Sequence, residues 1–471
     1  MSEIHDLTAR EQWERLQQRQ LSPLEIVDHY LSRIERLDDG LGAFVTVTPD
    51  AARERARRLG DAGPRPDPLW GLPFADKDLT MRAGVPAKFG SRLMADFVPD
   101  TSDELPQALD AAGGISLGKT NTPEFGMPSY TESLVAPPAR TPWNPALGAG
   151  GSSGGAAVAV AAGLLPFAPG SDGGGSIRIP AAATGLVGVK PSRGLVPSGS
   201  GIGSLGGLPV AGPLARTVGD AAMLLDAMIG DEPFPFTLRA PRWEGGALSN
   251  AAIRGEGRYQ LAVMTTSPWD DAYDITVSSE ASAALDHGIA ELDALGHGIE
   301  AIALEPWPDY APHFRVLWQA GAAGIPAEGA ALELLEPLTR WLVERGRELP
   351  ARRLVEALAG LAQFERSVIR QFAPYDAIVT PALAMTPRPL GWYDSADGEK
   401  NFAQQVQYTP FTSFVNVSGL PAVTLPVHQT DDGLPMGIQL IGRPGGEATL
   451  LAIGAQLERR IGWQRRHPPQ W

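Results

Sequence analysis

Residues 144–216 are the most constraining part of this sequence, because glycine and other small residues dominate there. Two dense runs stand out, GGSSGG at 150–155 and SDGGGS at 171–176. Glycine is favoured where a backbone needs a positive φ or approaches another group closely. A flexible glycine-serine linker is the alternative, but the apolar segments 156–165 and 186–189 predict ordered structure instead. The region therefore predicts a packed core in which the backbone itself approaches a ligand.

Helix-like and strand-like segments alternate along the remainder of the chain. A helical pattern covers 11–37, with Ser22 as a cap, Pro23 at the first helical position and Glu25 at the third. Further helices are expected at 102–112, 156–168 (buried), 217–229 (amphipathic), 278–295, 332–372 and 450–457. Strands are expected after the turn at 70–74, at 114–118 and 260–264, around Ile299, and at 376–380, 422–426 and 436–441. Such alternation favours an α/β layered fold, and the Pro/Gly-rich segment 232–258 is expected to wrap its surface.

Composition excludes several classes of protein. The 471-residue chain is 43% hydrophobic and 20% charged, which is typical of a chain with a sizeable core and not of a disordered one. The net charge is −15 and no Lys/Arg-rich stripe occurs, so we expect no nucleic-acid partner. The absence of cysteine excludes disulfides, thiolate metal sites and a cysteine nucleophile.

The sequence offers no segment typical of a membrane or secreted protein. The longest apolar stretch, 156–168, contains Gly163 and Pro166 and is too short to span a bilayer. Residues 1–10 lack an apolar run of signal-peptide length. We therefore expect a cytoplasmic protein without a membrane partner.

The histidine pattern argues against two common hydrolase mechanisms. None of the seven histidines lies in the Gly/Ser-rich region, and no H-E-x-x-H or paired-histidine spacing exists. A zinc hydrolase and a Ser-His-Asp triad are therefore disfavoured. A serine nucleophile without histidine still needs a base, and a buried lysine can serve. Lys77 is the candidate, because it follows a strand-like segment; the alternative is a surface ion pair with Asp78.

Three glycines precede Ser176. Successive backbone N–H groups in such a loop can converge on one concavity, as an oxyanion hole requires. Two other glycine patterns are weaker. Residues 201–206 fit G-x-G-x-x-G, but prolines follow where a dinucleotide-binding helix should begin, and 150–155 lacks the Lys-Ser/Thr of a phosphate-binding loop.

Together these segments resemble the amidase-signature family of serine amidases. The resemblance rests on the 148–197 stretch, on the spacing of Lys77, Ser152 and Ser176, and on the C-terminal motifs 416–422 and 433–439. It implies one α/β/α layered domain over residues 1–471 with a mixed β-sheet core covered by helices. In this domain, 144–216 form the signature core and a helical segment over about 1–60 packs on it.

The resemblance also implies roles for individual residues. Ser176 would be the nucleophile, Lys77 the general base, and Ser152 the bridging serine, reached through a cis peptide bond after Gly151. The oxyanion hole would use the N–H groups of Gly173, Gly174, Gly175 and Ser176, and the residues that orient the triad would be Ser153, Asp172 and Arg178. No metal or organic cofactor is expected.

The expected function is hydrolysis of a carboxamide C–N bond in a neutral, apolar or aromatic small molecule. The chain looks similar to stand-alone bacterial amidases, including members that cleave nylon oligomers, carbamates or anilides, and it is expected to act as a monomer or homodimer. Two alternatives remain open: a glutaminase subunit of a tRNA-dependent amidotransferase, and an inactive binding homologue. The candidate pocket residues are Phe125, Met127 and Tyr130, followed by Trp318, Trp392 and Phe411.

Overall fold

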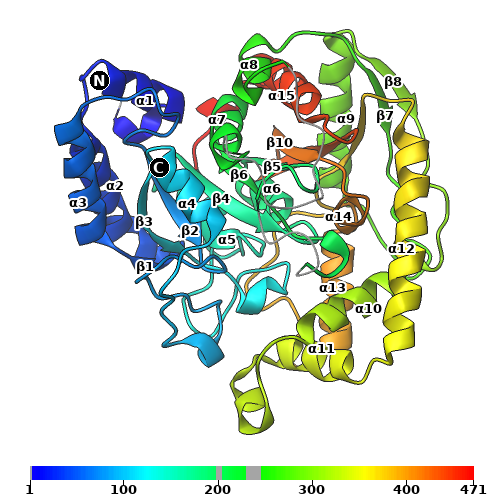
Figure 1. The fold of residues 1–471 in the computed structure, drawn as a ribbon. Coiled ribbons are helices and arrows are strands. Elements are labelled where there is room, and N and C mark those ends of the chain that lie inside the picture. Colours follow the sequence, from blue (N-terminus) through cyan, green and yellow to red (C-terminus); the bar gives the residue numbers. More distant parts are fainter. Residues whose placement is uncertain (1–2, 198–203, 230–244) are drawn as a thin grey trace.

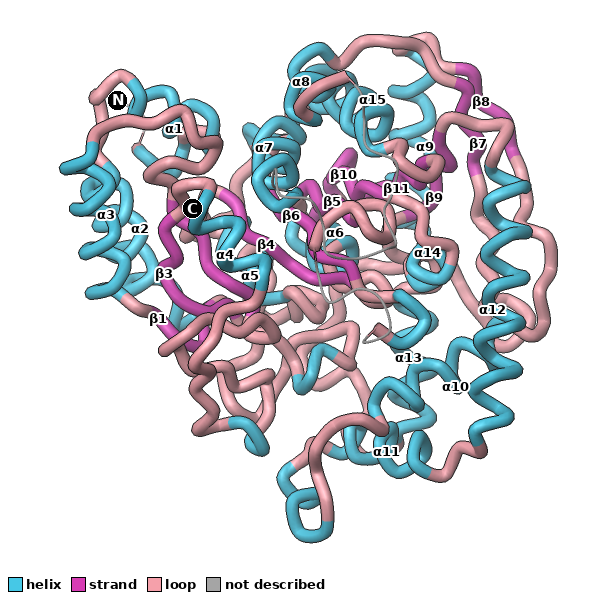
Figure 2. Tube along the Cα trace, in the orientation of Figure 1, coloured by secondary structure: helices cyan, strands magenta, loops and turns pink. Residues whose placement is uncertain are grey.

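An eight-stranded sheet forms the centre of the computed structural model, which describes residues 3–197, 204–229 and 245–471 (Figures 1 and 2). In spatial order its strands are β4 (Phe167–Asp172), β6 (Val210–Ala215), β5 (Val187–Lys190), β10 (Ala422–Gln429), β11 (Pro435–Gly442), β9 (Ala377–Pro381), β7 (Gln260–Val263) and β8 (Gly298–Ala301). Neighbouring strands are antiparallel from β4 to β9, whereas β9, β7 and β8 are parallel. The sheet is therefore mixed, and the predicted α/β fold class is confirmed.

A second, three-stranded sheet lies beside the first and was not anticipated. It contains β1 (Phe44–Val47), β3 (Ile115–Thr120) and β2 (Pro73–Lys77), with β1 antiparallel and β2 parallel to β3. Strand β2 is buried throughout and lies against β4 of the large sheet. The last residues of these two strands are Lys77 and Asp172, so the contact brings two chain segments to one place.

Helices surround both sheets. The α-helices are α1 (Ala9–Gln17), α2 (Pro23–Leu37), α3 (Pro49–Ala62), α4 (Glu104–Ala111), α5 (Gly154–Ala161), α6 (Arg178–Thr184), α7 (Val218–Ile229), α8 (Leu248–Arg254), α9 (Ser279–Ala294), α10 (Tyr310–Ala322), α11 (Pro337–Arg347), α12 (Ala351–Phe372), α13 (Gly398–Tyr408), α14 (Ser413–Val417) and α15 (Glu447–Ile461). Short 3₁₀ helices lie at Ile4–Asp6, Asp38–Gly40, Arg92–Met94, Glu124–Gly126, Leu205–Gly207, Gly329–Leu334 and Trp463–Arg465.

The large sheet is buried on both faces, as its apolar strands require. Leu261 and Val379 pack in one hydrophobic cluster with residues of α7, α9 and α15. Their chain neighbours Ala262 and Ile378 pack in a different cluster with α10, α12 and α14. Because successive side chains of a strand point to opposite faces, these two sets of helices cover opposite faces of the sheet, which gives the layered arrangement (Figure 1).

Several element boundaries differ from the sequence prediction. The pattern at 11–37 forms two helices, and the predicted capping box of Ser22 and Glu25 begins the second of them. The pattern at 332–372 is also divided, because Pro350 caps the start of α12. Helix α7 is buried on most sides and not on one face alone. Two predicted loops are described only in part. Residues 201–203 of the G-x-G-x-x-G pattern and residues 232–244 of the surface-wrapping segment lie outside the described residues.

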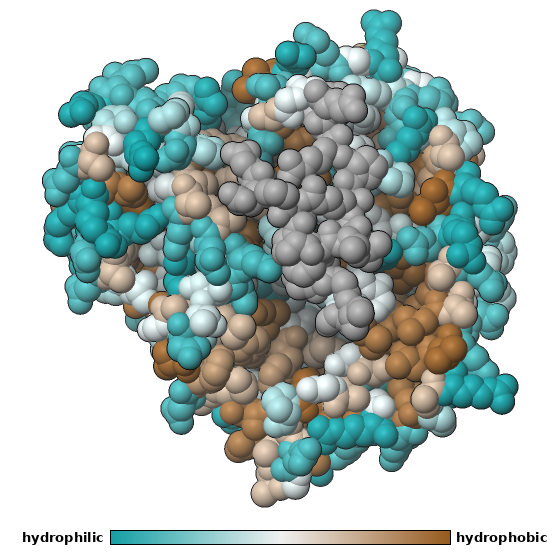
Figure 3. All heavy atoms as spheres, in the orientation of Figure 1, coloured by the Kyte–Doolittle hydropathy of each residue, from teal (hydrophilic) through white to brown (hydrophobic). Residues whose placement is uncertain are grey.

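The N-terminal helices are anchored to the Gly/Ser-rich region and to α7. Arg33 donates hydrogen bonds to the carbonyl oxygens of Ala162 and Gly163, at 2.9 and 2.8 Å. The Asp220 carboxylate accepts from the backbone N–H groups of Ala9 and Arg10 at the start of α1, where an anionic group favours the helix. Hydrophilic residues cover these helices in Figure 3, whereas apolar residues gather in the lower half of that view. Within the described ranges, no helix has the length and apolar character required to cross a membrane.

Candidate active site

Lys77 ends strand β2 with its amine deep inside the protein, where its side chain is 2% exposed. Its Nζ lies 2.7 Å from Ser152 Oγ, 3.0 Å from Ser171 Oγ and 3.3 Å from the Ser171 carbonyl oxygen. Burial lowers the pKa of Lys77 to about 7, although the Asp172 carboxylate acts in the opposite direction. A large fraction of the amine is therefore neutral at neutral pH and able to accept a proton.

Asp78 does not form the surface ion pair with Lys77 that the sequence left open. Both residues are buried, and Asp78 instead pairs with Lys119, whose Nζ lies 3.4 Å from Asp78 Oδ1. The Asp78 carboxylate also accepts a hydrogen bond from the Lys88 backbone N–H at 3.1 Å. Burial raises the pKa of the Asp78 carboxyl, while Lys119 opposes that shift. The ion pair with Lys119 leaves the Lys77 amine directed at the two serines.

Ser152 and Ser153 occupy the turn that leads into α5. The peptide bond between Gly151 and Ser152 is cis, as the family resemblance implied. Ser153 Oγ donates to the Ser171 carbonyl oxygen at 3.2 Å, and the Ser153 backbone N–H donates to the Ser176 carbonyl oxygen at 3.1 Å. Among the described residues, no hydrogen bond joins the hydroxyls of Ser152 and Ser176. The structure thus links Ser152 to Lys77 directly and holds Ser176 nearby through the backbone.

The triple glycine forms the loop between β4 and α6. The Gly175 N–H donates to Asp172 Oδ1 at 2.7 Å, and the Ile177 N–H donates to Asp172 Oδ2 at 3.1 Å. Gly175 therefore uses its donor inside the loop and does not present it to a substrate, contrary to the sequence prediction. The N–H groups of Gly173, Gly174 and Ser176 donate to no acceptor within the residues that the structure describes. These three donors remain available for an oxyanion.

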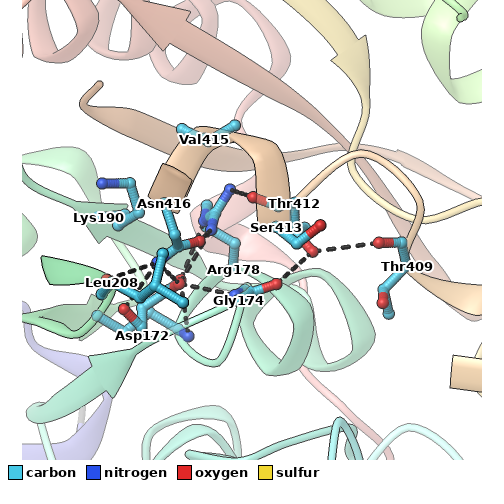
Figure 4. A network of polar contacts seen from close by, with 12 residues as sticks. Asp172, Gly174, Arg178, Lys190, Leu208, Thr409, Thr412, Ser413, Val415 and Asn416 are labelled. Atoms are coloured by element: carbon cyan, nitrogen blue, oxygen red, sulfur yellow. Dashed lines mark hydrogen bonds and ion pairs between the residues drawn. The ribbon is translucent and has the colours of Figure 1, made fainter. Parts of the chain in front are cut away.

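A buried ion pair between Asp172 and Arg178 lies beside this loop (Figure 4). Arg178 Nη2 and Nε lie 2.9 and 3.0 Å from the two Asp172 carboxylate oxygens. Burial acts to raise the pKa of the Asp172 carboxyl, but the Arg178 guanidinium outweighs it and lowers that pKa well below the usual range. The Asp172 carboxylate therefore stays charged inside the protein, where the bidentate contact with Arg178 and further hydrogen bonds compensate its burial. Asp172 and Arg178, which the family resemblance implies as residues that orient the triad, are thus paired with each other at the two ends of the glycine loop.

Sequence reasoning missed four polar residues of this centre. Ser171 contacts Lys77, whereas Thr412, Asn416 and Gln439 contact Arg178: its Nη1 lies 2.7 Å from Gln439 Oε1 and its Nη2 lies 2.6 Å from Asn416 Oδ1. Asn416 and Gln439 fall within the two C-terminal motifs that carry the family resemblance, which was the available signal. Nothing in their residue types indicated that they reach a loop far earlier in the chain.

A cavity opens beside Gly174 and Ser176. Of the candidate pocket residues, Met127 and Trp318 line it. The remaining described lining residues are Pro128, Ser129, Ile179, Trp269, Phe314, Phe402, Gln405, Val406, Thr409 and Ser413. None of the lining residues that the structure describes carries a formal charge, so the cavity suits a neutral, largely apolar group.

The other predicted pocket residues do not line this cavity. Phe125 stacks against Phe89, with ring centroids 6.2 Å apart. Tyr130 stacks on Tyr393 at 4.0 Å and accepts a hydrogen bond from the side-chain amide of Asn401. Trp392 and Phe411 also lie outside the lining of the cavity. Trp392 packs edge-on against the same Tyr393, and Phe411 is fully buried. Each of these rings is used for internal packing.

A possible metal-ligand group lies elsewhere in the chain. Ligand atoms of Glu3, His5 and His29 are within 4.8 Å of one another. His5 Nδ1 and His29 Nε2 are 3.1 Å apart, and the two rings are nearly parallel, at 18°. A ring nitrogen of one histidine is therefore at hydrogen-bond distance from that of the other, which already satisfies both atoms.

Comparisons with known proteins identify the family. A protein-family model described as Amidase matches residues 25–451. The chain is 38% identical over 454 residues to the putative amidase AmiB2 of Mycobacterium tuberculosis, covering 94% of each protein. It is also 34% identical over 489 residues to one subunit of the glutamyl-tRNA(Gln) amidotransferase of Nitratidesulfovibrio vulgaris, covering 98% of each.

A solved structure gives the same result for the fold. The structure of 6-aminohexanoate cyclic dimer hydrolase in complex with its substrate matches with a TM-score of 0.90 and 28% identity, over 99% of this chain and all of the other. With the family model matching most of the chain, this protein belongs to the amidase-signature family and is an amidase.

Proposed function

We propose that the protein hydrolyses a neutral amide through an acyl-enzyme on Ser176, with Ser152 and Lys77 as the proton relay. The observation that carries the proposal is the buried Lys77 amine, which lies 2.7 Å from Ser152 Oγ and has a pKa near neutrality. A general base is most efficient when its pKa lies near the pH at which the enzyme operates. A Lys77 pKa near neutrality meets this condition for an enzyme that works near neutral pH.

The first step forms the acyl-enzyme. Ser176 Oγ bonds to the amide carbonyl carbon, its proton passes to Ser152 Oγ, and the Ser152 proton passes to Lys77 Nζ. This relay requires the Ser176 hydroxyl to turn toward Ser152 once a substrate is bound. The resulting oxyanion accepts hydrogen bonds from the free N–H groups of the loop, and such preorganised donors are worth several kcal/mol to a transition state.

The second half of the reaction returns the proton. The C–N bond breaks as the leaving nitrogen takes a proton from Ser152, which is replenished from the Lys77 ammonium. Water then attacks the carbonyl carbon of the Ser176 ester. A proton of that water passes to Ser152, and the Ser152 proton passes to the neutral Lys77 amine. The carboxylic acid leaves and Ser176 regains its hydrogen, so the balance is one water consumed for each amide cleaved.

The cavity supports an aromatic or apolar substrate. Trp318 stacks with Phe314 at 5.6 Å, and Trp269 meets Phe314 edge-on at 5.3 Å. Edge and face contacts of this kind favour planar, weakly polar groups. Aryl amides, cyclic or linear oligoamides and carbamates all present such a neutral acyl group, and the similar solved enzyme is named for a cyclic amide dimer.

The glutaminase alternative predicts a different cavity. Glutamine carries an ammonium and a carboxylate, which require charged partners when bound away from water. The described lining residues are uncharged, which favours a stand-alone amidase over the glutaminase component of an amidotransferase, although a relative of the latter kind is similar along the whole chain.

The purified chain alone tests these assignments. We expect turnover of a neutral aryl amide such as an acetanilide, of a lactam oligomer or of an aryl carbamate, and none by Ser176→Ala. Glutamine should be a poor substrate. Glutamine hydrolysis faster than that of every neutral substrate would favour the amidotransferase alternative, and no turnover of any compound would indicate an inactive binding homologue.

A further inference from the structure

The peptide bond between Gly174 and Gly175 is held at both of its polar ends. Thr412 Oγ1 donates a hydrogen bond to the Gly174 carbonyl oxygen at 2.7 Å. At the other end, the Gly175 N–H donates to Asp172 Oδ1, also at 2.7 Å. Figure 4 shows these groups converging from α14 and from the end of β4. The plane of this peptide is therefore fixed by two side chains that lie far apart in the sequence.

This peptide lies between the N–H groups proposed to bind the oxyanion. The Gly174 N–H precedes it and the Ser176 N–H follows it directly. Glycine on both sides leaves the backbone with little intrinsic preference, and Gly175 has a φ of +132°. Rotation of the plane would redirect both neighbouring donors, so their orientation depends on the hydrogen bonds at its ends.

The close approach of Thr412 explains why position 175 is glycine. A Cβ atom on Gly175 would lie 2.5 Å from Thr412 Oγ1, which no real contact tolerates. The threonine is itself fixed, because its carbonyl oxygen accepts from Arg178 Nη1 at 2.9 Å. Its hydroxyl also lies 3.2 Å from the Thr409 carbonyl oxygen. Because a hydroxyl has one hydrogen to donate, we assign that hydrogen to the shorter contact, with the Gly174 carbonyl oxygen.

The other end of the peptide is secured by Asn416. Its side-chain amide lies 2.9 Å from Asp172 Oδ1 and 2.8 Å from the Asp172 carbonyl oxygen, and its own oxygen accepts from Arg178. Asp172 is therefore unable to turn away from Gly175. Residues of one short segment, Thr412 and Asn416, control both ends of the glycine loop.

We propose that Thr412 is a positioning residue for the reaction, which sets the direction of the oxyanion-binding N–H groups by fixing the Gly174–Gly175 peptide. This rests on the proposed function, because it assumes a tetrahedral intermediate on Ser176. Thr412 itself does not line the cavity, whereas its neighbours Thr409 and Ser413 do. Its loss should therefore affect the transition state more than substrate binding.

Two variants of Thr412 test the idea. Thr412→Val keeps the branched shape but removes the donor, and Thr412→Ser keeps the donor. We expect kcat of Thr412→Val for a neutral aryl amide to fall by roughly tenfold to a hundredfold, less than the 10²–10³ typical of losing an oxyanion donor outright. KM should stay within about twofold, and Thr412→Ser should retain kcat within about threefold.

An inhibitor comparison separates positioning from a general structural effect. An aryl trifluoromethyl ketone forms a tetrahedral adduct with a serine, whereas the matching aryl carboxylic acid product does not. Thr412→Val should weaken inhibition by the ketone by about the same factor as kcat, and should leave inhibition by the acid within about twofold. Equal weakening of both inhibitors would show that Thr412 shapes only the cavity and would overturn the proposal.

The remaining outcomes also decide the matter. Normal kcat in Thr412→Val overturns this proposal alone, whereas a wild-type enzyme without amide turnover overturns the proposed function and this inference with it. If Thr412→Val does not fold, Thr412→Ala replaces it in the same comparison with Thr412→Ser. Alanine also removes the donor, but it places no methyl group against the Gly174 carbonyl oxygen.

Discussion

The Lys77 amine and the Ser152 hydroxyl lie 2.7 Å apart in a region closed to solvent. Nearby, the Ser171 hydroxyl is 3.0 Å from the same nitrogen. Desolvation disfavours the ammonium form, and the carboxylate next in sequence, Asp78, pairs with Lys119 instead. An amine in this setting can accept a proton near neutral pH, as the proposed mechanism requires, and the first of the tests below follows from it.

The rate should rise with pH through the pKa of Lys77. Below about pH 7 the amine is protonated and cannot accept from Ser152, so kcat/KM should climb along one ascending limb to a plateau above it. Lys77→Ala should lose both the limb and most of the rate. Lys77→Arg should not restore activity, because guanidinium stays protonated. Near-normal turnover of Lys77→Arg at pH 8 would mean that Lys77 supplies a positive charge and does not act as a base. The control is Lys400→Arg, which makes the same substitution at an exposed lysine.

Ser176→Ala should abolish turnover and leave the fold intact. A nucleophile that acts as a unit with its base typically accounts for several orders of magnitude in kcat. The matched control is Ser418→Ala, which removes a buried hydroxyl that donates a local hydrogen bond to the Val415 carbonyl oxygen. Rates are measured with an aryl amide, and folding by circular dichroism. Activity of Ser176→Ala within tenfold of wild type would exclude it as the nucleophile.

Lys119→Met should destabilise the protein severely. The substitution leaves the buried Asp78 carboxylate without its cation, and breaking a buried pair in this way costs about 3–5 kcal/mol. Lys400→Met breaks an ion pair of similar length with Asp394, at 3.0 Å, but on the surface, where solvent screening makes the expected loss of stability small. Urea unfolding compares the two variants. Equal losses would show that Asp78 is satisfied by its backbone contact alone.

Neutral substrates should be cleaved faster than anionic ones. The described cavity wall has no cation to pair with a carboxylate, and the net charge of −15 repels anions at low salt. We expect kcat/KM for an acetanilide to exceed that for the matching amide of a dicarboxylic acid. Trp318→Ala should raise KM for the aryl substrate, since Trp318 lines the cavity. A preference for the dicarboxylate at low salt would point to a cation outside the described residues.

Local sequence pattern singles out the segments of the candidate site but not the roles of their residues. Glycine density marks the segments around Ser152 and Ser176, and a strand-like segment leads to Lys77. The catalytic roles of these three residues come from the family resemblance and stay predictions. Gly175 differs from the other two glycines, because its N–H group donates to the Asp172 carboxylate, which only the folded loop brings near. Residue type does not indicate which donors turn inward.

Long-range contacts explain the other omissions. Aromatic residues of the cavity, such as Trp269 and Phe402, lie on segments whose local pattern is that of ordinary core. Phe125 and Tyr130 were close in sequence to a turn near the site, yet they pack internally. Helical periodicity predicted elements well but not their interruptions, such as the break between the end of α11 at Arg347 and Pro350, which caps the start of α12.

The position of β10 and β11 in the sheet has a consequence for biosynthesis. These strands come late in the chain but lie in the middle of the sheet, between β5 and β9. While the ribosome is still extending the chain, the two halves of the sheet have unpaired inner edges, which are prone to misassembly. Asn416 and Gln439 arrive with the same late segment and complete the contacts of Arg178. A nascent chain therefore contains Ser152 and Ser176 well before the segment that completes the contacts of Arg178 has been synthesised.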